Sequence, residues 1–279
     1  MSDHPRIPLA GVIGSPIAHS RSPVLHGYWL KRYGLKGHYI PMDIAAVDLA
    51  EALKMLPRMG FVGLNVTIPH KETVLGLADI VTDRAALIGA ANTLIFRPDG
   101  KIHADNTDGV GFMANLRQNA PDWQPQSGPA VVFGAGGAAR AVIAALIEAG
   151  VPEIRLTNRT RARSELLRSA FGAKVTVVDW FAAQHELNDA VTVVNTTALG
   201  MTGKEEFTLS LDDLNPKALV NDLVYTPLRT GFLEQAAAKG CQTVDGLGML
   251  LHQAAPGFER WFGQRPEVDE ETRAVVLGA

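Results

Sequence analysis

The chain has 279 residues, a length that suits one large domain or two of ordinary size. Its 26 basic and 29 acidic residues give a formal net charge of −3, so nothing in the composition favours binding to nucleic acid or to a membrane surface. No apolar run approaches the roughly 18 residues of a spanning helix, no signal-peptide pattern opens the chain, and one cysteine, Cys241, excludes an internal disulfide. We therefore expect a soluble, cytoplasmic protein.

Strand-like and helix-like stretches alternate along the first half, which predicts an α/β fold with largely parallel sheets. The expected order is a strand over 8–14, a helix over 23–33, a strand over 38–44, a helix over 48–59, a strand over 61–67, a helix after Pro69, and short strands over 92–96 and 101–104. A helix over 107–118 then leads into a polar, proline-rich loop, 119–129.

The alternation starts again after this loop, which predicts a second α/β domain. Its expected strands are 130–133, 153–157, 175–177, 191–195, 219–222 and 242–244, and its helices are 138–149, 164–171 and 230–239. Two last helices, 247–262 and 269–277, follow a domain that is already complete, so we expect them to return to the first domain.

A glycine-rich turn joins the first strand of the second domain to its first helix. Gly134-Ala135-Gly136-Gly137-Ala138-Ala139 has the G-x-G-x-x-A form of a dinucleotide fingerprint. The turn would present free N–H groups and the positive end of a helix dipole to a pyrophosphate. The alternative is a glycine-rich turn of some other α/β protein, but the strand before it and the helix after it favour the dinucleotide site.

The next strand ends in Asn158-Arg159-Thr160-Arg161-Ala162-Arg163. Enzymes that use NAD commonly place an acid here, on the ribose 2′-hydroxyl. Three arginines at a helix start oppose the macrodipole, and a bound 2′-phosphate would offset that cost. The pattern favours NADP over NAD, and a solvated basic turn is the alternative.

Polar clusters follow several strands of the first domain, where α/β enzymes place their chemistry. Ser20 and Ser22 could donate to a carboxylate, although Ser22 could equally cap a helix. Lys71 would start the helix after Pro69, where the dipole favours proton loss and suits an acid or base, although most lysines are surface residues. Asp108 could pair with Lys71 or simply begin its own helix.

Two kinds of chemistry find no support in the sequence. The eight histidines and the cysteine have no metal-ligand spacing, so we expect no metal, and the G-x-S-x-G elbow of serine hydrolases is absent.

The motifs taken together resemble the shikimate dehydrogenase family over nearly the whole chain. They are 14–23 (GSPIAHSRSP), 63–71 (GLNVTIPHK), 89–93 (GAANT), 106–109 (NTDG), 134–138 (GAGGA), 158–160 (NRT), 195–197 (NTT), 222–228 (DLVYTPL) and 245–254 (DGLGMLLHQA). One departure is Ala198, where we expect proline; it lies in a cofactor loop and does not touch the chemistry.

The resemblance implies an N-terminal α/β substrate-binding and catalytic domain over 1–107, with the helices at about 247–279 packing back onto it. It implies a Rossmann-type NADP-binding domain over 108–246 and a deep interdomain cleft. The implied reaction is the NADP-dependent reversible reduction of 3-dehydroshikimate to shikimate, and the implied partner is that small molecule, with a homodimer as one state that the family allows.

The resemblance also implies residue roles. Lys71 and Asp108 form the catalytic acid/base pair, with Lys71 exchanging the proton at the reacting oxygen. The substrate would be bound by Ser20, Ser22, Thr67, Lys71, Asn92, Asp108, Tyr225 and Gln253, with the two serines on its carboxylate. The cofactor would be bound by Asp83, Gly134, Ala135, Gly136, Gly137, Ala138, Asn158, Arg159, Thr160, Arg163, Leu223, Gly246 and Met249.

Three other functions remain as alternatives. A quinate/shikimate dehydrogenase of broader substrate range has the same fold, and turnover of the two substrates separates them. A catalytically silent NADP-binding sensor would have no need of Lys71, Asp108 and both serines. An enzyme similar to methylene-tetrahydrofolate dehydrogenase fits the serine pair and the Asn-Arg-Thr turn poorly.

Overall fold

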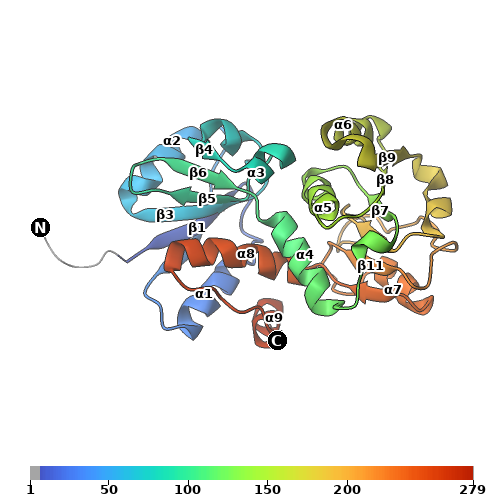
Figure 1. Cartoon of the computed structure of the whole chain (residues 1–279). Coiled ribbons are helices and arrows are strands. Elements are labelled where there is room, and N and C mark those ends of the chain that lie inside the picture. The colour runs from blue at the N-terminus through green and yellow to red at the C-terminus, as the bar shows by residue number, and fades with distance from the viewer. Residues whose placement is uncertain (1–6, 279) are drawn as a thin grey trace, which may run out of the picture. The chain divides into compact units, whose positions relative to one another are not determined.

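The computed structural model describes residues 7–278, which form two compact units, each built around a six-stranded sheet (Figure 1). Unit 1 takes the chain up to Thr107 and again from Leu251, whereas unit 2 is the continuous stretch Asp108–Leu250. Within 7–278, no helix combines the length and the apolar character that a bilayer crossing requires.

The sheet of unit 1 has the order β2-β1-β3-β5-β6-β4. Its strands are β1 (Leu9–Gly14), β2 (His38–Asp43), β3 (Phe61–Val66), β4 (Ile80–Val81), β5 (Thr93–Phe96) and β6 (Ile102–Asp105). Strand β1 pairs in parallel with β2 and β3, while β5 runs antiparallel to both β3 and β6. The sheet is therefore mixed: the two short predicted strands, β5 and β6, pair with each other in antiparallel fashion beside a parallel core of β1, β2 and β3.

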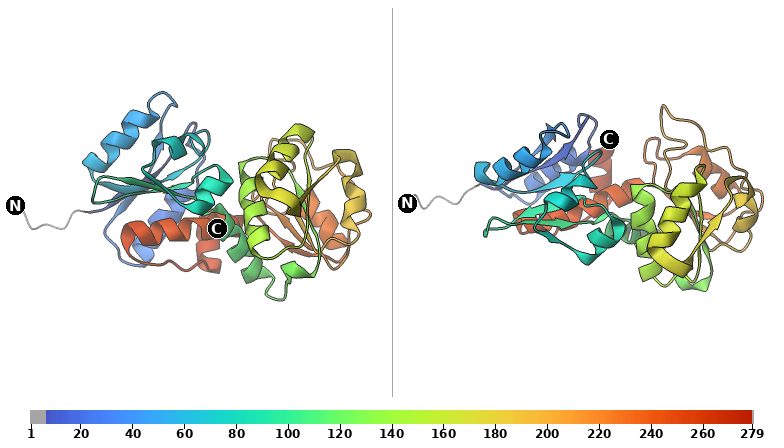
Figure 2. Two further views of the ribbon diagram at one scale, coloured as in Figure 1. Left: turned by 45° about the horizontal axis from the view of Figure 1, so that its top comes forward. Right: turned by 90° about the horizontal axis from the view of Figure 1, so that it is seen from above.

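Helices cover both faces of this sheet (Figures 1 and 2). The helices of this unit are α1 (Ser22–Arg32), α2 (Leu49–Met55), α3 (Asp83–Ile88), the C-terminal part of α8 (Leu247–Phe262) and α9 (Glu270–Leu277), of which α9 packs on α1. Alternation along β1 sends Ile13 into a cluster with α2 and Val12 into a second cluster with Trp261 of α8. The Trp261 Nε1–H also donates to the Leu94 carbonyl at 3.1 Å, so the returning helix is tied to the sheet.

The helix predicted after Pro69 is wrong. The structure has turns, a short 3-10 helix η2 (Thr73–Leu77), strand β4 and then α3. Asp79 exchanges bonds with Ile102, since the Asp79 N–H reaches the Ile102 carbonyl at 2.9 Å and the Ile102 N–H reaches Oδ2 of Asp79 at 2.8 Å. Pairing with β6 thus outweighs the weak helical propensity of a segment that contains glycine and β-branched residues.

The sheet of unit 2 is fully parallel, with the order β12-β11-β10-β7-β8-β9. Its strands are β7 (Ala130–Phe133), β8 (Ile154–Thr157), β9 (Val175–Val178), β10 (Thr192–Asn195), β11 (Leu219–Asp222) and β12 (Gln242–Val244). Numbered within the unit, this is the 3-2-1-4-5-6 order of a Rossmann fold, whose switch point lies between β7 and β10.

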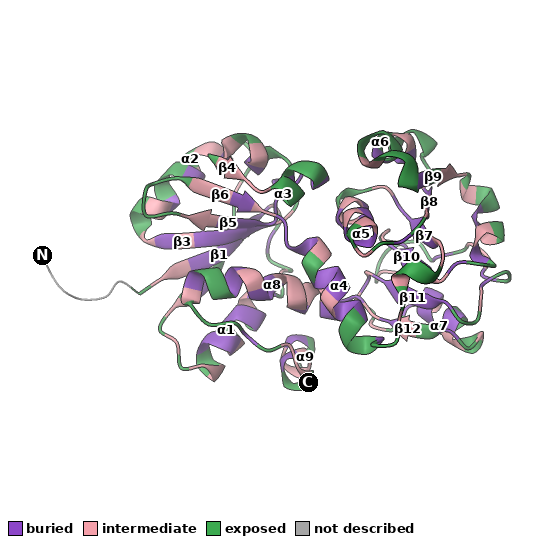
Figure 3. Cartoon of the chain, in the orientation of Figure 1, coloured by how far each residue is buried: buried purple, intermediate pink, exposed green. Residues whose placement is uncertain are grey.

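Helices also sandwich this second sheet. They are α4 (Asp108–Asn119), α5 (Gly137–Glu148), α6 (Arg161–Phe171) and α7 (Gly231–Ala238), with a 3-10 helix, η5 (Trp180–Leu187). Val132 packs with α4 and α5 on one face, and Val131 packs with α7 and η5 on the other. Burial on both faces explains why the central strand β7 is a continuous apolar run whose four residues are all buried (Figure 3).

Candidate functional site

The predicted glycine turn lies at the switch point of unit 2, between β7 and α5. Gly134 has a φ of +105°, and a Cβ there would stand 2.6 Å from Oγ1 of Thr196, so only glycine fits. Gly136 is the N-cap of α5 and has no side-chain cap, and a Cβ built on Gly136 or Gly137 meets no atom within 4 Å. The start of α5 therefore offers backbone N–H groups and open space to an anion.

A pocket of about 500 Å³ opens in front of this turn. Its lining residues are Gly134, Ala135, Gly136, Asn158, Arg159, Arg163, Trp180, Thr196, Thr197, Ala198, Leu199, Gly203, Lys204 and Glu205. Arg161 and Arg163 lie in the first turn of α6, which holds no acid, as the sequence predicted. The pocket joins a pyrophosphate cradle to a basic end, an arrangement that fits a dinucleotide with an extra phosphate.

The loop after β10 completes the pocket through a buried polar network. Oδ1 of Asn195 accepts from both the N–H and the Oγ1–H of Thr197, at 3.0 and 2.7 Å, while its Nδ2 donates to Asp222 at 3.0 Å. The other Asp222 oxygen accepts from Thr230 at 2.6 Å. Burial raises the pKa of Asp222 to about 6, although the hydrogen bonds from Thr230, Val224 and Asn195 partly oppose this.

The sequence identified only part of this pocket. Trp180, Lys204 and Glu205 line it but lie in segments without a motif, so they could not be assigned from the sequence. Among the expected cofactor residues, Gly137, Ala138 and Thr160 adjoin the lining. Leu223 and Met249 pack against the core of unit 2, the Gly246 N–H donates to the Val224 carbonyl at 3.3 Å, and Asp83 is an exposed first residue of α3 in unit 1.

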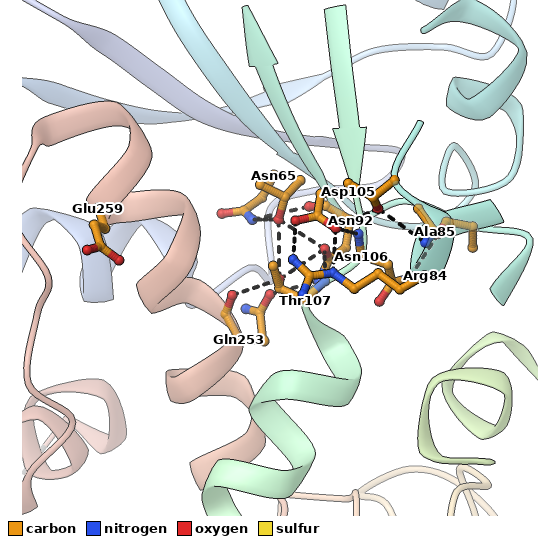
Figure 4. Close-up of polar contacts among 12 residues, drawn as sticks. Asn65, Arg84, Ala85, Asn92, Asp105, Asn106, Thr107, Gln253 and Glu259 are labelled. Carbon is orange, nitrogen blue, oxygen red and sulfur yellow. Dashed lines mark hydrogen bonds and ion pairs between the residues drawn. The ribbon is translucent and has the colours of Figure 1, made fainter. Parts of the chain in front are cut away.

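In unit 1, Asn92 and Gln253 come together although 161 residues separate them (Figure 4). Nδ2 of Asn92 donates to Oε1 of Gln253 at 3.1 Å, and Oδ1 of Asn92 accepts from the N–H of Thr107 at 2.9 Å. Thr107 Oγ1–H donates to the Gln253 carbonyl at 2.8 Å, and Asn65 donates to the Asn92 carbonyl at 3.2 Å. These bonds fix the amide orientations, and a fixed set of amides and hydroxyls suits a ligand rich in hydroxyl groups.

Tyr39 anchors the same network from the edge strand β2, across β1 from the strand that carries Asn65. Its hydroxyl donates to Oδ1 of Asn65 at 2.7 Å, and both side chains are buried. Burial is the main reason why the pKa of Tyr39 lies well above its usual value. The phenol is therefore a neutral donor that holds Asn65 in place.

The two serines lie at the start of α1. Ser22 is buried and is the first residue of the helix, while the N-cap is Arg21, which makes no side-chain cap. The alternative in which Ser22 caps the helix is therefore wrong. Instead, Oγ of Ser20 accepts a hydrogen bond from the Ser22 N–H at 3.3 Å, which holds the two serines together at the start of α1.

Lys71 lies in the turn that follows β3 and Thr67, and both side chains are half-buried. The prediction that Lys71 starts a helix is wrong, because η2 begins only at Thr73. The argument that a helix dipole favours proton loss from Lys71 therefore does not hold. The Lys71 backbone is fixed, since its carbonyl accepts from Ala91 at 2.8 Å. The preceding His70 is buried and its Nε2 contacts the Ile44 carbonyl at 2.7 Å, which gives it a structural role.

Asp108 is the buried first residue of α4 and follows Thr107 of the amide cluster directly. The nearby Asp105 has a different task, because it binds Arg84, Thr82 and the N–H of Asn106 (Figure 4). Burial alone would raise the pKa of Asp105, but these bonds and the charge of Arg84 lower it. Tyr225, the remaining expected substrate residue, is half-buried after β11 in unit 2.

The structure has no cluster of side chains suited to hold a metal ion: over residues 7–278, no group of three or more His, Cys, Asp or Glu is suitably placed.

The fold and the two sites together define the class of protein. Unit 2 is a Rossmann-type dinucleotide-binding fold with a basic cofactor pocket, and unit 1 is an α/β unit with a convergent amide and hydroxyl cluster, as in a nicotinamide-dependent oxidoreductase.

Comparison with known proteins specifies the family. Three family models match: the shikimate dehydrogenase substrate binding domain over 12–94, shikimate/quinate 5-dehydrogenase over 117–216 and the shikimate 5′-dehydrogenase C-terminal domain over 246–275. A shikimate dehydrogenase (NADP(+)) of Cereibacter sphaeroides is 79% identical over 99% of both chains, and one of Paracoccus denitrificans is 68% identical over 97% of this chain and 96% of its own. The chain belongs to the shikimate dehydrogenase family.

Solved structures agree with this assignment. The shikimate 5-dehydrogenase of Thermus thermophilus in complex with NADP(H) and shikimate has a TM-score of 0.86 and 36% identity, covering 97% of this chain and 99% of its own. A quinate dehydrogenase of Corynebacterium glutamicum in complex with NAD has a TM-score of 0.90 and 32% identity, with the same coverage. The fold is thus shared by enzymes that differ in substrate and cofactor.

Proposed function

We propose that this protein is an NADP-dependent oxidoreductase that reversibly reduces 3-dehydroshikimate to shikimate, the step of the shikimate pathway that leads toward chorismate and the aromatic amino acids. The observation that carries the proposal is the full-length identity of 79% to a relative named shikimate dehydrogenase (NADP(+)). The basic end of the pocket supports the cofactor, because Arg159 and Arg163 line it and no acid follows β8 directly.

The expected substrate-binding residues have distinct tasks in this proposal. Ser20 and Ser22 would hold the substrate carboxylate, and Thr67, Asn92, Tyr225 and Gln253 would bind its hydroxyl groups. The bonds of Asn92 to Thr107 and Gln253 preset these amides before the substrate arrives. Such preorganisation lowers the entropic cost of binding.

NADPH supplies a hydride to the C3 carbonyl carbon when it is bound. Lys71 then donates a proton to the carbonyl oxygen, which becomes a hydroxyl group, and Asp108 orients both that oxygen and the lysine ammonium. In the reverse direction Lys71 takes the proton back. General acid catalysis of this kind contributes roughly 10²- to 10⁴-fold in rate.

An absorbance assay of the reduced nicotinamide tests the proposal with four pairs: shikimate or quinate, each with NADP or NAD. We expect the highest kcat/KM with shikimate and NADP. Faster turnover of quinate would favour a quinate/shikimate dehydrogenase of broader range, and no turnover with any pair would contradict an enzymatic function.

The cytoplasmic location and a homodimer are parts of the same proposal. The family's biosynthetic role supports the first. Sedimentation of the purified protein tests the second, and a mass near 29.9 kDa at all concentrations would refute the homodimer.

A further inference from the structure

The guanidinium of Arg159 already has an anionic neighbour within the cofactor pocket. Its Nη1 contacts Oε2 of Glu205 at 2.7 Å, and both residues line the pocket. Backbone bonds hold the loop that carries Glu205, since its carbonyl accepts from Gly200 at 2.7 Å and the Lys204 N–H reaches the Met201 carbonyl at 2.9 Å. The carboxylate therefore has a defined place beside the arginine that the 2′-phosphate would need.

Glu205 is the only acid among the described lining residues of this pocket, whose basic lining residues are Arg159, Arg163 and Lys204. A 2′-phosphate bound at Arg159 would have to displace this carboxylate or share the guanidinium with it, and it would feel repulsion in either case. A ribose 2′-hydroxyl has no such conflict, because a carboxylate can accept its hydrogen bond, as acids do in enzymes that use NAD.

We propose that Glu205 is a specificity-determining residue that weakens the preference of the pocket for NADP over NAD. The inference rests on the proposed function, since it takes Arg159 as the 2′-phosphate ligand. The ion pair is solvent-exposed, with side-chain exposures of 63% for Arg159 and 73% for Glu205. An exposed pair changes an equilibrium by about two- to fivefold, so Glu205 adjusts the preference and does not reverse it.

The test compares Glu205→Gln with Glu206→Gln. The control makes the same charge change one residue further on, at an exposed side chain that does not line the pocket. Direct titration with NADPH and with NADH, followed by protein fluorescence, gives the Kd of each cofactor without turnover. Because the Glu205 side chain is exposed, we expect the variant to keep its fold, and a thermal melt of each variant checks this.

For Glu205→Gln we expect the Kd for NADPH to fall about two- to fivefold, with no such gain for NADH. The gain should shrink in high salt, which screens exposed charges, and Glu206→Gln should behave as wild type. An unchanged or weaker NADPH affinity in Glu205→Gln, or an equal gain in Glu206→Gln, would overturn the inference.

The same titrations separate this inference from the proposed function. A wild-type protein that binds NADH as tightly as NADPH would contradict the NADP assignment itself. A wild-type preference for NADPH that Arg159→Gln removes but Glu205→Gln leaves unchanged would refute the role of Glu205 alone.

Discussion

Alanine substitutions at Gly134 and Gly136 should separate the structural from the binding role of the glycine turn. Gly134→Ala forces a side chain into a left-handed backbone with φ +105° and within 2.6 Å of Thr196 Oγ1. Thr196 cannot retreat freely, because its Oγ1 donates to the Phe133 carbonyl at 2.7 Å. The backbone costs about 1–2 kcal/mol and overpacking about 1–3 kcal/mol, so we expect a loss of about 2–5 kcal/mol in the free energy of unfolding.

Gly136→Ala is the matched control. Gly136 has φ −96° and ψ −169°, an extended conformation that alanine adopts without strain, and the added Cβ meets no atom within 4 Å. Its stability should stay within about 0.5 kcal/mol of wild type. The added methyl group points into the space in front of the helix start, so we expect NADPH affinity to fall about tenfold or more, which is about 1.4 kcal/mol.

Urea denaturation followed by circular dichroism measures the first effect, and fluorescence titration with NADPH measures the second. Gly134→Ala with wild-type stability would refute the packing argument for the turn. Gly136→Ala with wild-type NADPH affinity would show that the pyrophosphate does not approach the turn at Gly136.

Three further predictions concern a proton donor, a buried acid and a buried phenol. Lys71→Ala should cut kcat by roughly 10²- to 10⁴-fold with little change in KM, and near-normal turnover would remove Lys71 from the mechanism. Burial raises the pKa of Asp222 from 3.8 to about 6 in the folded protein. The stability that its protonated carboxyl contributes is therefore full below pH 3.8 and is lost as pH rises through 6. The free energy of unfolding falls by about 3 kcal/mol over this range. Asp222→Asn should remove this slope in urea titrations between pH 4 and 7, and an unchanged slope would refute it. Tyr39→Phe should cost about 1–3 kcal/mol in stability, because it leaves buried Asn65 Oδ1 without its donor; a urea midpoint equal to wild type would contradict that role.

The local signals of unit 2 were strong enough to predict most of its fold. Strand β7, the glycine turn and α5 each have a short-range cause, namely an apolar run, a residue free to adopt positive φ, and a helix of alanine, isoleucine and leucine. The arginines after β8 were likewise predicted, and two of the three, Arg159 and Arg163, line the pocket, whereas Arg161 pairs with Glu165. The contribution of Glu205 could not be predicted, because a loop after β10 brings it to Arg159 across 46 residues.

Long-range pairing also explains what the sequence did not reveal in unit 1. The segment after Pro69 became η2, β4 and α3 because β6 offers it a partner, a contact that a local pattern cannot show. Gln253 could be assigned only through the family resemblance, since no local pattern around Gln253 indicates its hydrogen bond with Asn92.

Unit 1 is assembled from both ends of the chain, and this has a consequence for its synthesis. Trp261 packs under the sheet and bonds to Leu94, yet it leaves the ribosome only after all of Asp108–Leu250 has been made. At a synthesis rate of about 5–20 residues per second, one apolar face of the nascent sheet stays exposed for on the order of ten seconds before α8 can cover it. The stretch encoded in the middle can finish folding first, so the N-terminal strands are the part of the newborn polypeptide with most need of a chaperone.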